Sequence, residues 1–66
     1  MTQTERKAII QNALAHWAQA KRSGSPEHLR SALSDMENTF SAVCLWAVPG
    51  TEDLRQAILS ARKEVL

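Results

Sequence analysis

An apolar ladder in the middle of the chain constrains the fold more than any other feature of the sequence. The spacings between its members alternate between four and three residues. Residues at these spacings lie on the same side of an α-helix, so the pattern predicts one long helix with an apolar seam. The ladder consists of Leu29, Leu33, Met36, Phe40, Val43 and Ala47.

The ladder runs into seven consecutive apolar residues, at positions 42–48. A single seam buries only one stripe of a helix, so the other sides of this block need cover from elsewhere. In one interpretation the block is the core of a monomeric three-helix bundle and the flanking helices cover it. In the other, part of the block forms an intermolecular surface, because the first helix supplies few large apolar side chains. The sequence leaves both interpretations open.

Turn and capping residues divide the chain into three predicted helices. Gly24 closes the first helix, and Pro26 occupies the first position of the second. Pro49 ends the second helix, and Thr51 caps the third. Thr2 and Glu5 fit a capping box at the start of the chain. We therefore expect helices at about residues 3–22, 26–47 and 51–65.

No run of residues alternates with the period of a strand, so the predicted fold class is all-α. The link between the first two helices is about three residues long, which favours an antiparallel helical hairpin. A shorter C-terminal helix completes the predicted arrangement. We expect one small helical domain over residues 1–66, completed by dimerisation.

The size of the chain favours self-association. At 66 residues, a single core only just offsets the loss of chain entropy, and domains of this size commonly add disulfides, a metal or another copy. Cys44 is the only cysteine, so an internal disulfide is not possible. A homodimer is the simplest remaining source of stability.

A lone thiol within an apolar run suits a reducing compartment. The N-terminal residues lack the apolar stretch of a secretory signal, and no apolar run approaches the length that spans a bilayer. We therefore expect a cytoplasmic protein that does not enter a membrane.

Charge is spread unevenly although the net charge is only +1. Residues 1–22 carry four basic and one acidic side chain, for a net +3, whereas residues 23–48 carry one basic and three acidic, for a net −2. Residues 49–66 balance at three of each. Opposite charge on the first two segments favours packing between them, within or between chains. The small net charge is far from the basic excess of a dedicated nucleic-acid binder.

The sequence offers no pattern of catalytic or cofactor-binding residues. His16 and His28 lie on different predicted helices, and neither has a second ligand at the close spacing of a zinc motif. The two glycines are both assigned to turns, so no phosphate-binding loop is expected. We predict a protein that is not an enzyme and has no catalytic residues, metal or cofactor.

A DNA-binding role is the main alternative. Two helices joined by a short glycine-containing turn resemble the outline of a helix-turn-helix, with the 51–65 helix as the reading element. Against this, Glu52 and Asp53 would place two carboxylates beside the DNA backbone. The candidate DNA contacts are Arg55, Gln56, Arg62 and Lys63.

The surplus of apolar residues favours a non-catalytic interaction protein. We expect a homodimer that binds a larger protein and changes its activity by occupying a surface. Inhibitors and anti-activators that phages and plasmids direct against host regulators fit this description, by analogy of size and lack of chemistry alone. Aromatic residues are enriched where interfaces concentrate their binding energy. The predicted interface residues are Trp17, Phe40, Val43, Leu45, Trp46 and Leu59.

Overall fold

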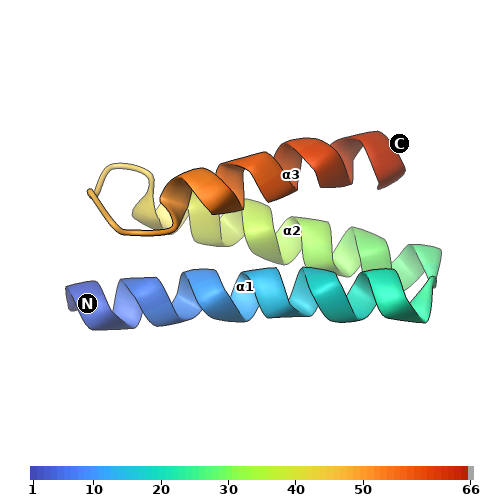
Figure 1. Ribbon diagram of the computed structural model, residues 1–66, viewed down its shortest axis with the longest axis horizontal. Coiled ribbons are helices and arrows are strands. Elements are labelled where there is room, and N and C mark those ends of the chain that lie inside the picture. Colours follow the sequence, from blue (N-terminus) through green and yellow to red (C-terminus); the bar gives the residue numbers. More distant parts are fainter. Residues whose placement is uncertain (66) are drawn as a thin grey trace.

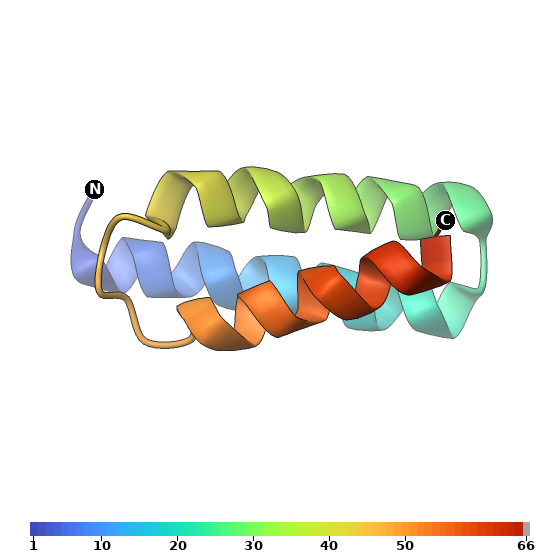
Figure 2. The same cartoon turned by 90° about the horizontal axis from the view of Figure 1, so that it is seen from above.

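The computed structural model describes residues 1–65 and contains three α-helices in this range. They are α1 (Gln3–Ser23), α2 (Pro26–Val43) and α3 (Thr51–Val65). α1 and α2 run side by side in opposite directions, and α3 returns alongside them from the loop after α2 (Figures 1 and 2). The predicted all-α class is confirmed. No helix among residues 1–65 is long and apolar enough to cross a bilayer.

Both ends of α1 are capped as the sequence predicts. The Thr2 hydroxyl accepts a hydrogen bond from the Glu5 backbone N–H at 3.1 Å, and the Glu5 carboxylate accepts one from the Thr2 N–H at 3.3 Å. This reciprocal pair is a capping box. At the other end Gly24 adopts φ 68°, and its N–H donates to the Ala20 carbonyl. The left-handed conformation at Gly24 allows the chain to reverse within two residues.

α2 ends at Val43, four residues before the predicted end at residue 47. Pro49 cannot continue a helix and disfavours a helical conformation at Val48. The chain instead begins to turn at once: the Trp46 N–H donates to the Val43 carbonyl at 2.9 Å, and the Val48 N–H donates to the Trp46 carbonyl at 2.8 Å. The loop of residues 44–50 therefore replaces the last turn of the predicted helix.

The core receives side chains from all three helices and from the loop. Its largest fully buried members are Ile10, Met36, Val43 and Leu54, and Val48 reaches it from the loop with only 5% of its surface exposed. Thr39 is the buried polar residue among those described. The remaining buried apolar residues are Ala13, Trp17, Ala20, Ala32, Ile58 and Ala61.

Candidate interaction surfaces

The six predicted interface residues fall into three places in the structure. Val43 and Trp17 lie in the core, with 0% and 5% of their surface exposed, so their assignment to an intermolecular surface is corrected here. Val43 is the last member of the ladder to remain on α2 and points between the helices. Trp17 is covered because α1 packs its Ile10, Ala13, Trp17 and Ala20 stripe against the other two helices.

Leu45 and Trp46 are exposed to solvent in the loop 44–50. Leu45 exposes 91% of its surface and Trp46 exposes 51%. Their neighbour Cys44 carries an exposed thiol, whereas an apolar environment was expected for it. Met1, with 66% exposed, lies at the same end of the molecule as this loop (Figure 1). We call Met1, Cys44, Leu45 and Trp46 the loop-end patch.

Contacts with α1 fix one side of this loop. The Gln3 side-chain amide donates to the Ala47 carbonyl at 2.9 Å, and the Arg6 guanidinium lies 3.6 Å from the centroid of the Trp46 ring. A cation over an aromatic face at this distance is attracted by the ring quadrupole. The indole of Trp46 is therefore held against the first turns of α1 while half of its surface remains in water.

Buried side chains fix the two ends of the loop. Val43 precedes it, and Val48 returns to the core after only four exposed residues. The Thr51 hydroxyl and the Thr51 N–H both donate to the Val48 carbonyl, at 2.8 Å and 3.2 Å. Gly50 adopts φ 95°, which other residues rarely tolerate. The loop thus has a defined shape, and its exposed apolar side chains are presented from a fixed base.

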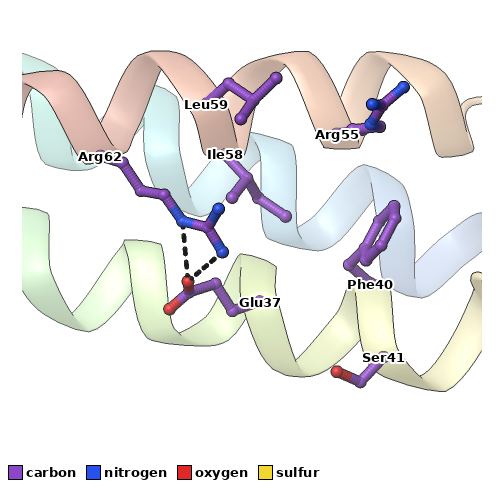
Figure 3. Close-up of a pocket in the computed structure, with 7 residues that line it drawn as sticks. All are labelled: Glu37, Phe40, Ser41, Arg55, Ile58, Leu59 and Arg62. Atoms are coloured by element: carbon purple, nitrogen blue, oxygen red, sulfur yellow. Dashed lines mark hydrogen bonds and ion pairs between the residues drawn. The ribbon is translucent and has the colours of Figure 1, made fainter.

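Phe40 and Leu59 line a groove between α2 and α3 of about 460 Å³ (Figure 3). Phe40 is half-buried and Leu59 is 41% exposed. Arg62 crosses the groove, and its Nε and one terminal nitrogen both donate to Oε2 of Glu37, at 3.2 Å and 2.8 Å. The other lining residues are Ser41, Arg55 and Ile58. The groove combines an apolar floor with two guanidinium groups.

The four candidate DNA contacts are all exposed on α3, but three of them contact carboxylates. The side chains of Arg55 and Gln56 both reach Glu52, at 3.5 Å and 3.1 Å, and Arg62 contacts Glu37. Lys63 lies one residue further along the same helix. In addition, α3 runs back along α2 (Figure 2), whereas the helices of a helix-turn-helix cross at about 90–120°. Neither arrangement favours a DNA-reading helix.

The structure brings together two histidines that the sequence placed on separate helices. The ring centroids of His16 on α1 and His28 on α2 are 5.4 Å apart. Asp35 and Ser23 complete a polar cluster around them. The signal in the sequence is that both histidines lie within eight residues of the turn at Gly24, on opposite sides of it. Among residues 1–65, no group of three or more histidine, cysteine or acidic side chains is arranged to hold one ion.

Comparisons of the chain with protein-family models, with curated proteins and with solved structures found no match.

Proposed function

We propose that the protein is a small, non-catalytic helical interaction protein that acts in the cytoplasm as a homodimer. In this proposal the hairpin of α1 and α2, with the shorter α3, is completed by a second copy. The homodimer binds a larger protein and modulates or inhibits it by covering part of its surface. The loop-end patch and the groove between α2 and α3 are the two regions through which the chain contacts the second copy and the larger protein.

The observation that carries the proposal is the exposure of Leu45 and Trp46. Burying apolar surface contributes roughly 25 cal/mol per Å², and tryptophan is among the residues that concentrate binding energy at interfaces. The side chains are held by a loop whose ends are anchored at Val43 and Val48. Because this base is already ordered, little conformational entropy is lost when a partner binds it.

The groove between α2 and α3 supplies a second, chemically different contact. Its apolar floor suits the apolar face of a partner helix, the mode in which a helix docks into a hydrophobic groove. Arg55 and Arg62 at its rim are paired with Glu52 and Glu37, so the rim offers polar groups of both charges to that helix. Leu59 projects at the edge of the same groove with 41% of its surface exposed, so it extends the apolar contact.

The size of the molecule is compatible with a dimer interface on one face. The chain exposes 4328 Å² of surface, and a standard interface covers about 800 Å² per partner, or about a fifth of that area. A chain of 66 residues has a small core, and a second copy would add apolar burial without a disulfide.

The oligomeric state is tested by light scattering over a dilution series with the unmodified protein, Leu45→Glu and Ala15→Glu. Ala15 is an exposed alanine on α1 and serves as the matched control. The unmodified protein and the control are expected at twice the mass of one chain, and Leu45→Glu at the mass of one chain. A single-chain mass for the unmodified protein at high concentration would contradict the homodimer.

The larger partner is tested by capture from the native cell extract, with the same three proteins as baits. A partner of the homodimer should be retained by the unmodified protein and by Ala15→Glu, and lost from Leu45→Glu, which is expected not to dimerise. Equal retention by all three baits would exclude the loop-end patch as the binding surface.

A further inference from the structure

The polar cluster at the turn end of the α1–α2 pair brings two imidazole rings within 5.4 Å of each other, measured between their centroids. We propose that His16 and His28 together bind a divalent transition-metal ion of the zinc class, with water in the remaining coordination positions.

The distance between the rings fits a shared ion. Zinc lies about 2.0–2.1 Å from an imidazole nitrogen, so two rings bound at a tetrahedral angle place their centroids about 5 Å apart. The observed distance between the His16 and His28 centroids is 5.4 Å, with the ring planes inclined by 47°.

A carboxylate favours one tautomer of the neutral His16 ring. Nδ1 of His16 lies 3.1 Å from Oδ2 of Asp35, and an ionised carboxylate only accepts hydrogen bonds. The neutral ring therefore carries its proton on Nδ1, and Nε2 presents a lone pair. Histidine ligands of metals generally donate their second nitrogen to a carboxylate or carbonyl in this way, which orients the ring and raises its basicity.

The protonation of His28 follows from the hydrogen bonds of Ser23. The hydroxyl of Ser23 has one hydrogen, which it donates to the Ala20 carbonyl at 3.0 Å. Its lone pairs face the Ser25 N–H at 3.3 Å and Nδ1 of His28 at 2.9 Å. With the Ser23 hydrogen directed to the carbonyl, the neutral His28 ring that satisfies this contact is the one that donates from Nδ1, which leaves a lone pair on Nε2. The same tautomer is the one favoured at His16.

The same hydrogen bonds argue against a nucleophilic serine. A histidine that activates a serine must accept the hydroxyl proton. Here that proton is directed to a main-chain carbonyl, and His28 is the donor. Ser23 therefore positions His28 and does not react through it.

A bound ion would join α1 to α2 across the turn at Gly24. His16 and His28 belong to different helices, so the ion would link them only when the helices are packed together. An ion that binds the folded chain and not the unfolded chain shifts the equilibrium towards the folded state. In a chain with one cysteine, this link would take the place that a disulfide has in other small domains.

The test is isothermal titration with ZnCl₂, together with thermal unfolding, in a Cys44→Ser background that removes the exposed thiol as a competing ligand. One zinc ion per chain is expected, with a rise in Tm on the order of 5–10 °C at free zinc ten-fold above the Kd. His16→Gln and His28→Gln should each abolish the saturable binding. Glutamine retains a side-chain N–H donor but is a poor zinc ligand, so folding is expected to persist.

Two further variants distinguish zinc bound by the histidines, with Asp35 behind one of them, from zinc attracted by acidic side chains in general. Asp35→Asn should weaken zinc binding by about 10–100-fold, the usual effect of removing the carboxylate behind a histidine ligand. Asp53→Asn removes one acidic charge from the exposed start of α3 and should leave binding unchanged. Mg²⁺ should give no saturable binding because it prefers oxygen ligands.

Nitrogen NMR of the two imidazoles gives a readout that does not depend on affinity. At a pH well above the usual titration range of histidine, both Nε2 atoms of the metal-free protein should have the shift of an unprotonated nitrogen, and both should move when zinc is added. The proposal is overturned if zinc binds the two glutamine variants as well as it binds the background protein. It is also overturned if saturable binding is absent, or if the imidazole nitrogens do not shift.

Discussion

The guanidinium of Arg6 lies 3.6 Å from the centroid of the Trp46 ring and connects the first turns of α1 to the loop after α2. These two residues are 40 positions apart in the sequence. The contact covers part of an indole that is otherwise in water, with 51% of its surface still exposed. Arg6 therefore holds in position an aromatic side chain that the core does not cover.

Replacing Arg6 tests the strength of this contact. Arg6→Ala should lower the free energy of unfolding by about 0.5–1 kcal/mol, the range of a cation–π pair near the surface. Urea unfolding followed by circular dichroism measures the change. Lys7→Ala removes an exposed positive charge from the adjacent position and is the control, with no measurable change expected. Equal effects of the two substitutions would indicate that charge alone, and not the ring contact, is responsible.

Met36 and Leu45 should respond differently to truncation. Met36 is completely buried, and Met36→Ala should cost about 2–5 kcal/mol through lost burial and the cavity left behind. Leu45 is 91% exposed, and Leu45→Ala should change the stability of the isolated chain by less than about 0.5 kcal/mol.

The effects of Met36→Ala and Leu45→Ala on stability should also differ in how they depend on protein concentration. If Leu45 packs against a second copy, the destabilisation caused by Leu45→Ala should grow as the concentration rises, because association stabilises by mass action. The destabilisation caused by Met36→Ala should be the same at every concentration. Denaturation midpoints over a hundred-fold dilution range measure both, and a Leu45→Ala effect independent of concentration would contradict self-association through this residue.

Gly24 should be sensitive to substitution for conformational reasons alone. Its φ is 68°, and a Cβ atom built there meets no heavy atom within 4 Å. Gly24→Ala should therefore destabilise the protein by about 1–2 kcal/mol through left-handed backbone strain and not through a clash. Gly24→Asn should cost less because asparagine tolerates this conformation better. Thermal unfolding of the two variants checks the order, and a larger loss for asparagine would contradict the explanation.

The protein should not bind duplex DNA. The side chains of Arg55 and Arg62 are engaged with Glu52 and Glu37, and Glu52 and Asp53 lie at the N-terminus of α3. Gel-shift titrations at low salt should show no complex, since two carboxylates face the position where a recognition helix approaches phosphates. A complex that weakens steeply with salt and is lost in Arg62→Ala would instead support the helix-turn-helix alternative.

The sequence predicts the parts of this structure that depend on local chemistry. Thr2 with Glu5, Gly24, and Pro26 each define a helix end through their own hydrogen bonds or backbone preference, and the structure confirms these ends. The period of the apolar residues predicts three helices because it reflects which side of each helix is buried. The all-α class follows from these two kinds of signal.

The sequence does not predict features that depend on the tertiary packing of the helices and the loop. Ala47 continues the ladder in spacing, yet α2 ends at Val43 because Val48 enters the core and the chain must turn before it. Trp17 and Val43 could not be distinguished from interface residues, since a buried apolar residue has the same periodicity in either role. The pairing of His16 with His28 depends on the packing of α1 against α2, which neither segment specifies alone.

The loop between Val43 and Val48 has a consequence for how the sequence of such a protein can vary during evolution. Its two buried valines carry most of the structural requirement, and Trp46 and Ala47 each add a contact with α1. Leu45, with 91% of its surface exposed, is largely free of this requirement. In the proposed function, substitutions at Leu45 would alter which molecule is recognised while the helices keep their packing. Related proteins would then diverge in target without first having to regain stability.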